Sequence, residues 1–389
     1  MEENKYIKIS ELCKKVCSGG TPKSSVTSYY DGNIPWLNTK EINFNRIYST
    51  ERNITEEGLN NSSAKWIEKN AVVVAMYGAT AGKSAISKIP LTTNQACCNL
   101  MINPEKADYR FVYYALASDY NRLASLANGG AQQNLNAQQI KDFEIPKFTL
   151  EEQKRIADFL SSLDDKIELN RQINDNLEQQ AQALFNDMFF NNIELERYSL
   201  SNYADINPFR NLKKNTVARF IEMSNLPTQG SFPLNWDYKL FNGGMKFTNG
   251  DTIMARITPC LENGKTAYID FLDDNEVAFG STEYIVFSAK EDYCPALFYF
   301  LARNQEFIDY AISHMNGSSG RQRVSGNDIA NFPMPHISKD LSDKFDKIVM
   351  PIMSNIRDNS IMNRSLVLMR DTLLPRLMSG ELKINEINC

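Results

Sequence analysis

The stretch AQQNLNAQQIKDFEIP at residues 131–146 has a second copy in GRQRVSGNDIANFPMP at residues 320–335. At a constant offset of 189 residues, the identical positions are Gln133 and Gln322, Ile140 and Ile329, Phe143 and Phe332, and Pro146 and Pro335. Self-similarity at a fixed spacing indicates that one structural unit has been repeated. The repeat therefore decides how the whole chain is organised.

The same offset continues without a gap into two segments of heptad-like sequence. The first follows the phase of Ile156, Leu160, Leu163, Ile167, Asn170, Asn174, Leu177, Ala181 and Leu184. The second follows that of Phe345, Val349, Ile352, Ile356, Asn359, Asn363, Leu366, Arg370 and Leu373. Apolar residues at alternating spacings of four and three are typical of a coiled-coil helix. The alternative is a long amphipathic helix packed on a globular core.

Four asparagines favour the coiled coil. Asn170 and Asn174 interrupt the first seam, and Asn359 and Asn363 interrupt the second at the same phase. A buried asparagine in a seam lowers stability and fixes the register of the helices. We therefore expect the two helices to pack against each other within one chain. Pro351 has no counterpart in the first copy and is expected to kink the second helix or to mark its start.

Upstream, the repeat is looser but follows one plan. FVYYALA at 111–117 resembles LFYFLA at 297–302, and each leads through a glycine-rich loop to the shared Ile-x-x-Phe-x-x-Pro segment. Each half is predicted to be a globular α/β domain followed by a long helix. The predicted segments are a first domain, a first helical region, a second domain and a C-terminal helical region, at 1–150, 151–192, 193–338 and 339–389.

Two glycine-lysine elements resemble phosphate-binding loops but have the wrong spacing. Gly82-Lys83-Ser84 and Gly264-Lys265-Thr266 each follow an apolar strand. A P-loop needs a glycine five positions before its Gly-Lys pair, and here those positions hold Tyr77 and Pro259. A nucleotide hydrolase using Lys83 or Lys265 is thus a weak alternative, and a duplicated element with another purpose is favoured.

Composition narrows the class of protein. The chain has 389 residues, 42% of them hydrophobic, which suffices for two domains with cores of their own. The formal charge of −5 gives little non-specific attraction to a polyanion, so binding to DNA would rely on local patches and on a partner. No signal peptide and no apolar run of about 20 residues is apparent. With seven scattered cysteines, we expect a cytoplasmic protein with reduced thiols.

Catalytic motifs are not apparent. The chain has only two histidines, and no zinc site, metal site or cofactor is expected. There is no Gly-x-Ser-x-Gly elbow. Asn207-Pro208-Phe209 lacks the second proline of the amino-methyltransferase motif, and a turn that opens the second domain is the favoured interpretation. Asp164-Asp165 is interpreted as a solvated acidic pair on a helix.

The glycine-rich loops suit DNA recognition. Glutamine and asparagine pair with adenine and arginine with guanine, so the two loops predict different base preferences. The candidates are Gln132, Gln133 and Asn134 in the first loop, with Asn136 beside them, and Arg321, Gln322 and Arg323 in the second. Lys83 and Lys265 are candidates for phosphate contacts, which position the protein without reading bases. The competing interpretations are solvated polar turns and unpartnered surface lysines.

Taken together, these segments resemble the specificity subunit of type I restriction–modification systems over essentially the whole chain. The matching segments, in the expected order, are SGGTPKSSVTSYYDGNIPWLNTKEI at 18–42, GATAGKSAI and TTNQACCNL, IPKFTLEEQKRIADFLSSLDDKIELN, and TLLPRLMSGEL at 372–382. The last two are the most specific, because they are similar to the two conserved helical regions of that family.

The resemblance implies an architecture and partners. Two target recognition domains, related by a pseudo-twofold repeat, would each read half of a bipartite, asymmetric site in double-stranded DNA. The two helices would pack antiparallel as a spacer of ~45 Å, similar to the ~34–36 Å between half-sites one turn apart. Two adenine methyltransferase subunits and restriction subunits would join this non-catalytic chain, with no membrane involved. A coiled-coil scaffold without DNA readout is the remaining alternative.

Overall fold

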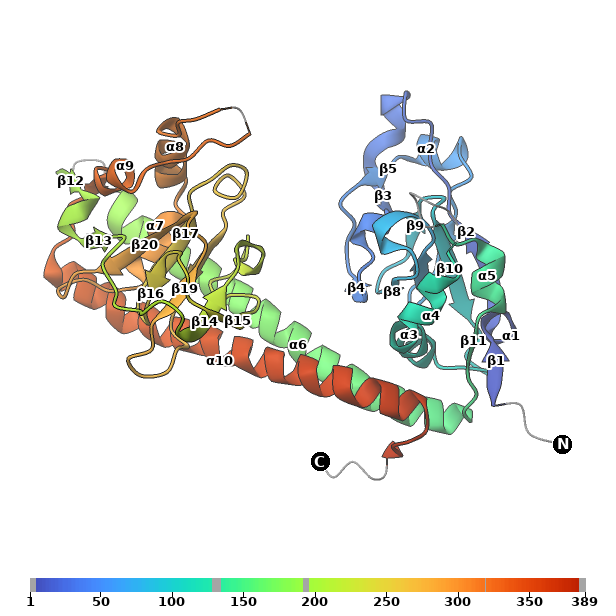
Figure 1. Ribbon diagram of the computed structural model, residues 1–389. Helices are drawn as coiled ribbons and strands as arrows, with labels where there is room; N and C mark the ends of the chain where they lie inside the picture. The colour runs from blue at the N-terminus through green and yellow to red at the C-terminus, as the bar shows by residue number, and fades with distance from the viewer. Residues whose placement is uncertain (1–4, 128–133, 192–195, 319, 385–389) are drawn as a thin grey trace. The chain divides into compact units, whose positions relative to one another are not determined.

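The structure is a computed structural model that describes residues 5–127, 134–191, 196–318 and 320–384. The chain divides into two compact units. The first comprises Met1–Asp165 and Leu366–Cys389, and the second comprises Lys166–Ser365. Both units combine β-sheets with helices (Figure 1). The predicted α/β class with two globular parts is therefore confirmed.

The first unit is built on two sheets and a two-stranded ribbon. The five-stranded sheet has the order β2 (Cys13–Ser18), β10 (Cys97–Ile102), β7 (Val72–Ala75), β8 (Ser84–Ser87) and β4 (Asn45–Ile47). The four-stranded sheet has the order β5 (Asn53–Ile54), β3 (Tyr30–Leu37), β9 (Leu91–Thr93) and β6 (Trp66–Ile67). The ribbon pairs β1 (Tyr6–Lys8) with β11 (Glu144–Pro146). The helices are α1 (Ile9–Leu12), α2 (Glu56–Asn60), α3 (Tyr109–Ser118), α4 (Tyr120–Ser125), α5 (Ala137–Asp142) and the first part of α6 (Leu150–Phe185).

Strand β7 shows why an uninterrupted apolar run forms the centre of this unit. Successive side chains of a strand point to opposite faces of the sheet. Val72 and Val74 pack in the cluster that contains Phe111 of α3, whereas Val73 and Ala75 pack in a second cluster on the other face. All four residues are buried. Because both faces are covered, the strand needs apolar residues at every position rather than an alternating pattern.

The second unit repeats this plan. One four-stranded sheet has the order β13 (Ala204–Ile206), β20 (Tyr284–Ala289), β17 (Thr252–Ala255) and β18 (Thr266–Tyr268). The other has the order β15 (Asp237–Leu240), β14 (Val217–Ile221), β19 (Ala278–Gly280) and β16 (Lys246–Phe247). The ribbon pairs β12 (Arg197–Ser199) with β21 (Pro333–Pro335). The helices are α7 (Leu297–Ala302), α8 (Gln305–Ser313), α9 (Gly326–Ala330) and α10 (Lys339–Met378), the last of which ends in the first unit.

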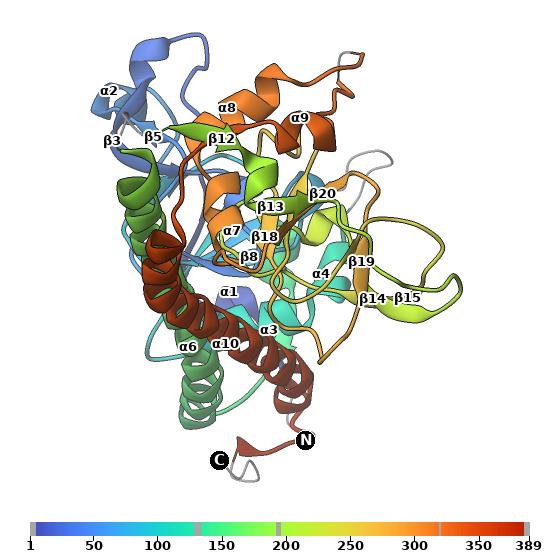
Figure 2. The ribbon, with the colours of Figure 1, turned by 90° about the vertical axis from the view of Figure 1, so that its left-hand side faces the viewer.

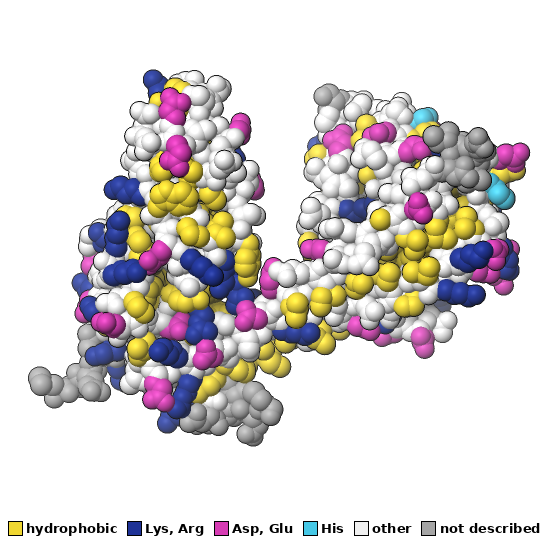
Figure 3. Space-filling model, turned by 180° about the vertical axis from the view of Figure 1, so that it is seen from behind, with side chains coloured by type: hydrophobic (Ala, Val, Ile, Leu, Met, Phe, Trp, Pro, Cys, Tyr) yellow, Lys and Arg dark blue, Asp and Glu magenta, His cyan; other side chains and the backbone are white. Residues whose placement is uncertain are grey.

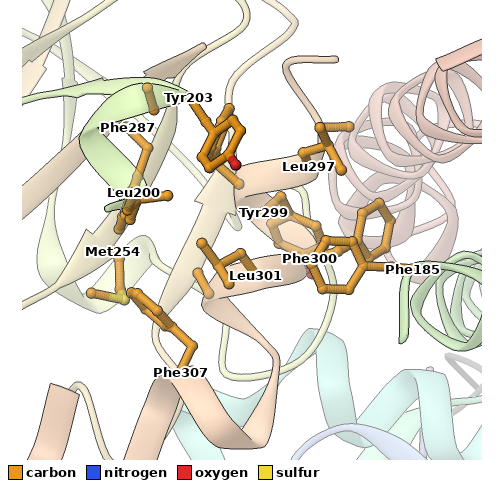
Figure 4. Close-up of a cluster of buried hydrophobic side chains, with 14 of the residues drawn as sticks. Phe185, Leu200, Tyr203, Met254, Phe287, Leu297, Tyr299, Phe300, Leu301 and Phe307 are labelled. Atoms are coloured by element: carbon orange, nitrogen blue, oxygen red, sulfur yellow. The ribbon is translucent and has the colours of Figure 1, made fainter. Parts of the chain in front are cut away.

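Aromatic side chains fill the core of the second unit. Every residue of α7 is buried, and Phe300 lies 6.2 Å from Phe185 of α6, measured between ring centroids (Figure 4). Phe345 of α10 packs edge-on against Phe185 at 6.0 Å. Aromatic rings bury large apolar areas and prefer such tilted or edge-on contacts. The core thus ties the sheet, α7 and both long helices of this unit together.

The offset of 189 residues relates secondary-structure elements as well as individual residues. Strands β11 and β21 occupy equivalent positions, and each pairs with the first strand of its own unit. The long helices begin at Leu150 and Lys339, which are also equivalent. Helix α10 starts well before Pro351 and continues through it, so the expectation that this proline marks the helix start was wrong. A proline removes one backbone hydrogen-bond donor from a helix. The 40-residue helix α10 tolerates that loss.

The long helices run antiparallel within each unit. In the first, Ile156 and Leu160 near the start of α6 share a core with Leu374 and Leu377 near the end of α10. In the second, the end of α6 packs on the start of α10, as the contact of Phe185 with Phe345 shows (Figure 2). The predicted antiparallel packing is confirmed in both units.

The four seam asparagines contact one another in the second unit. Asn170 donates from Nδ2 to Oδ1 of Asn363 at 2.8 Å, and Asn359 donates to Oδ1 of Asn174 at 2.9 Å. Asn363 also donates to the carbonyl of Ile167, and Asn174 donates to the carbonyl of Ile356 and to Ser360 Oγ. Paired amides satisfy most of the polar groups that the seam buries.

The long helices of the first unit make an ionic contact at positions whose repeat equivalents in the second unit are apolar. Arg370 donates to Asp164 at 2.7 Å, and the Tyr114 hydroxyl donates to the same carboxylate at 2.6 Å. The equivalents of Asp164 and Arg370 are Met353 and Ala181, which are buried in the core of the second unit. Asp165, the neighbour of Asp164, forms an ion pair with Arg46. Both acidic residues are therefore bound to arginines; Asp165 is still 67% exposed, whereas Asp164 is largely buried, so the expectation of a solvated pair was wrong for Asp164.

No helix in the described part of the chain is both long enough and apolar enough to cross a membrane.

Candidate nucleic-acid interface

The glycine-lysine elements form equivalent turns in the two units. In the first, Ala75 donates its backbone N–H to the carbonyl of Lys83, and in the second Ala255 donates to the carbonyl of Lys265, each at 2.9 Å. The glycines before the lysines have φ of +85° and +70°, a left-handed conformation that a side chain disfavours. The turns are thus a conserved part of the internal repeat.

Each turn joins two antiparallel strands. The first connects β7 to β8 and the second connects β17 to β18. A phosphate-binding loop instead connects a strand to a helix whose N-terminus faces the phosphates. The connection is therefore incompatible with a P-loop, in agreement with the spacing of the glycines.

Each lysine holds the segment that follows an inner strand of the neighbouring sheet, β3 in the first unit and β14 in the second. Lys83 Nζ donates to Oδ1 of Asn43 at 2.7 Å. Lys265 Nζ donates to the carbonyl of Met223 at 2.8 Å. An ammonium group has three donors, so each lysine retains capacity for a further acceptor such as a phosphate oxygen. Both lysines are half-buried.

The described end of the first loop is fixed to the segment directly after β7. Asn134 forms a bridge with Tyr77, and Leu135 donates its N–H to the carbonyl of Met76 at 2.8 Å. Leu135 is buried, whereas the side chain of Asn134 is exposed and can reach an external partner. The other two candidates of this loop, Gln132 and Gln133, lie outside the described residues.

Asn136 has a local structural role. Its side chain accepts a hydrogen bond from the N–H of Gln139, and the Gln139 side chain accepts from the N–H of Asn136. This reciprocal pattern is a capping box at the start of α5. Ser325, the equivalent residue in the second unit, caps α9 in the same way with Asp328. Asn136 is therefore a helix cap and not a free base-reading amide.

The second loop is closed at its base. Asn316 and Arg323 exchange two backbone hydrogen bonds of 2.9 Å. The N–H of Thr258 donates to the carbonyl of Gln322, and the N–H of Gln322 donates to Thr258 Oγ1 at 3.0 Å. The backbone of Gln322 is thus fixed to the segment that follows β17, while its side chain is half-exposed.

Arg323 is bound to a carboxylate that sequence reasoning missed. Its Nε and Nη2 donate to Glu283 at 2.7–2.9 Å. Hydrogen bonds from this guanidinium hold the pKa of Glu283 below its usual value. Glu283 lies far from Arg323 in sequence, and no spacing indicated the pair. Arg323 is therefore braced within the protein, and among described residues Arg321 is the loop arginine whose side chain is exposed and makes no hydrogen bond.

Arg256 is a second residue that the sequence did not single out. It follows β17 directly, its N–H donates to the carbonyl of Glu283, and its carbonyl accepts from Val324. Its side-chain Nε is buried without a hydrogen-bond partner. Such an orphaned buried nitrogen is uncommon, and a basic residue immediately after a strand was the available sequence signal.

These residues have a chemistry of recognition rather than of bond breaking. Arg256, Lys265, Arg321 and Arg323 lie on segments joined by hydrogen bonds, and the carboxylate of Glu283 is paired with Arg323. Such a group offers donors to phosphates and to the O6 and N7 acceptors of guanine. His314 stacks on Tyr310, and His336 lies against Tyr198. In the described ranges, no group of three or more His, Cys, Asp and Glu residues is placed to hold a metal ion.

Comparison with known proteins adds independent evidence. Residues 1–179 match the family model described as "Type I restriction modification DNA specificity domain". The chain is 26% identical over 425 aligned residues to the type I restriction enzyme MjaIX specificity subunit of Methanocaldococcus jannaschii, covering 96% of this chain and 92% of that protein. It is 30% identical over 152 residues to the EcoR124I/EcoR124II specificity subunit of Escherichia coli, covering 38% of this chain and 37% of that one.

A solved structure shares the fold. The crystal structure of a type I restriction–modification system S subunit from M. genitalium matches with a TM-score of 0.62 at 19% sequence identity, covering 97% of this chain and 98% of that one. At that identity the match concerns the fold alone.

Proposed function

Because this chain belongs to the family of type I restriction–modification specificity subunits, whose non-catalytic role is DNA sequence specificity, we propose that it recognises a bipartite, asymmetric DNA site. Each unit reads one half. The chain thereby directs associated adenine methyltransferase and restriction subunits to that site in the cytoplasm.

The observation that carries this proposal is one scaffold with two sets of side chains. Both units place a glycine-lysine turn beside the loop that precedes the shared Ile-x-x-Phe-x-x-Pro segment. The first loop presents Asn134, and the second presents Arg321 beside the braced Arg323. An amide favours adenine and a guanidinium favours guanine, so two like scaffolds would read unlike half-sites.

The division of labour follows the four segments predicted from the repeat. Residues 1–150 and 193–338 act as the two target recognition domains, and 151–192 and 339–389 act as the helical regions. Replacing 1–150 with the equivalent segment of a relative is expected to change one half-site and leave the other intact. Sequencing the methylome of a host that expresses the chain with its methyltransferase measures this directly. A change in both halves would contradict the division.

The long helices offer surfaces for partner subunits. Figure 3 shows a run of hydrophobic side chains over these helices. In the second unit the exposed large apolar residues of these helices are Leu169 and Ile173 of α6 and Ile348, Ile361 and Met362 of α10. Exposed apolar runs rimmed by polar residues mark protein–protein contacts. We assign this surface to the methyltransferase subunits, two per chain because the helices are repeated.

The same helices are proposed as a spacer between half-sites. Inserting one heptad into both helices should alter the preferred gap between the half-sites, as read from the methylome. An unchanged gap would contradict the spacer. An electrophoretic shift with the methyltransferase present tests the scaffold alternative, because a scaffold without DNA readout would give a complex with no sequence preference.

A further inference from the structure

The second unit displays one aromatic side chain almost entirely to solvent. Phe209 is 87% exposed, the largest exposure among the large hydrophobic residues of the described chain. Leaving such a side chain in water gives up the free energy of burying it, about 1.5–3 kcal/mol. An isolated exposed phenylalanine on a loose loop would need no explanation, so its surroundings decide what it means.

The residues on both sides of Phe209 are fixed. Asn207 exchanges hydrogen bonds with Val286 of β20 through its backbone N–H and its side-chain Oδ1, at 2.7 and 2.9 Å. Arg210 donates to both oxygens of Asp251, which is buried, and to Ser288 Oγ at 2.8 Å. Phe209 is therefore held outward by its neighbours.

One lysine lies over the ring of Phe209, and a second lysine–aromatic contact lies on strands β14 and β15. Lys246 Nζ lies 5.0 Å from the centroid of the Phe209 ring, and Lys239 Nζ lies 4.3 Å from that of Phe220. Such distances are those of cation–π contacts. Lys239 also lies 3.9 Å from Asp237, the one carboxylate in ion-pair distance of these lysines within the described residues.

Strand register shows that these groups share one face of a sheet. Lys246 lies opposite Phe279, Phe279 lies beside Phe220, and Lys239 lies opposite Ala218. Directly opposed residues point to the same side. The loop 211–216 crosses this face, because Leu212 packs in the cluster of Phe279. Its two lysines, Lys213 and Lys214, are exposed and form no ion pair with any described carboxylate.

We infer that this face is a second contact surface for the DNA duplex, adjoining the half-site read by the second unit. We call it the aromatic–lysine face, and its residues are Phe209, Lys213, Lys214, Phe220, Lys239 and Lys246. The inference rests on the proposed function. Lys213, Lys214 and Lys246 hold backbone phosphates, and Phe209 contacts the bases or sugars as an apolar wedge.

Charge complementarity selects the occupant. The segment 207–216, NPFRNLKKNT, contains no acidic residue and three cations, of which Arg210 is paired with Asp251 while Lys213 and Lys214 are exposed, in a chain whose formal net charge is −5. A polyanion profits from such a local concentration of cations, and bases offer flat apolar faces to an aromatic side chain. The loop at 316–323 reads bases, whereas this face adds binding affinity and orients the protein on the duplex.

The test is DNA binding by the assembled methyltransferase complex at several salt concentrations. The variant Lys213→Gln/Lys214→Gln is expected to bind specific and non-specific DNA several-fold more weakly. The slope of log affinity against log salt should fall in magnitude by about 2, because each lost phosphate contact removes about 0.9. Phe209→Ala is expected to lower affinity about tenfold with an unchanged salt slope, and Phe209→Trp is expected to retain it.

The matched control removes two lysines that already have partners. Lys290 donates to the carbonyl of Ser201, and Lys339 forms an ion pair with Asp292, so Lys290→Gln/Lys339→Gln should bind DNA like the wild type. Equal affinity and slope for both double variants would overturn the inference. So would loss of methyltransferase assembly with DNA affinity per complex unchanged, which would make the face a protein contact. Failure of the wild-type complex to prefer any sequence would instead refute the proposed function.

Discussion

Asn170 donates its amide hydrogen to Asn363 across the helix seam, and its equivalent in the repeat, Asn359, donates in the same way to Asn174. Because Asn363 is the equivalent of Asn174, exchanging the two helices leaves the pattern of pairs unchanged. This is the self-complementary arrangement of a twofold interface, here built within one chain. Duplication therefore produced a polar register in which each copy supplies the partner that the other needs.

The asparagine pair is expected to be coupled in its effect on stability. Asn170→Leu leaves the Oδ1 of Asn363 without its donor in a seam where Asn170 is fully buried, so the thermal midpoint should fall. Asn170→Leu/Asn363→Leu removes both partners and should restore or exceed the wild-type midpoint. Gln179→Leu, at an exposed position of α6, is the control with no expected change. Additive losses in the double variant would show that the pair is not coupled.

The ionic contact in the first unit should be replaceable by the apolar residues of the second. Arg370→Ala alone leaves the largely buried carboxylate of Asp164 without its guanidinium and is expected to cost about 1–3 kcal/mol, less than for a fully buried pair. The combination Asp164→Met/Arg370→Ala/Tyr114→Phe transplants the residues of the second unit and removes the hydroxyl left without an acceptor. Its denaturation midpoint should lie above that of Arg370→Ala, and a lower midpoint would contradict this.

Asp270 makes stability depend on pH. Burial raises the pKa of its carboxyl to about 7 despite the nearby Arg357. The folded chain then binds a proton that the unfolded chain has lost, so stability decreases as pH rises from about 4 to about 7 and is level above. Asp270→Asn should therefore be more stable than the wild type at pH 8, and this advantage should vanish near pH 4. Thermal midpoints at several pH values check the trend, with Asp274→Asn at an exposed position as control. An advantage independent of pH would contradict it.

Arg321 should specify a base in one half-site only. Arg321→Ala removes the exposed guanidinium of the second loop, and discrimination at one position of that half-site should weaken by about 1–3 kcal/mol. Selection of bound sites from a randomised pool measures the preference at every position. Arg323→Ala disrupts the brace with Glu283 and should reduce affinity without relaxing a single position. Relaxation in both half-sites after Arg321→Ala would refute the assignment.

The sequence predicted what the repeat controls. The offset that aligns Phe143 with Phe332 also relates the starts of α6 and α10, because buried periodic positions leave the chain little freedom to shift. The capping role of Asn136 was readable as well, since Gln139 follows three residues later as in a capping box. It was missed because an amide beside a glycine-rich loop was interpreted as a base reader.

Contacts between distant segments could not be predicted. Lys83 binds a side chain of Asn43, whereas its equivalent Lys265 binds the backbone of Met223, so the repeat itself did not indicate the acceptor. The brace between Glu283 and Arg323 joins two segments that only the sheet brings together. A solitary charge in a sequence has no visible partner, and its role depends on which other charge the fold places beside it.

The unequal contacts along the helices determine which helix can accept which. Two copies of α6 paired antiparallel would set Asp164 of each against Ala181 of the other, leaving two carboxylates unneutralised. Two copies of α10 would in the same way place Arg370 of each against Met353 of the other, leaving two arginines without a carboxylate. Only a pair of one α6 and one α10 sets Arg370 against Asp164 at one position and Ala181 against Met353 at the other. Pairing of like helices from two chains is thus disfavoured, so α6 accepts α10 as its partner rather than a second copy of itself.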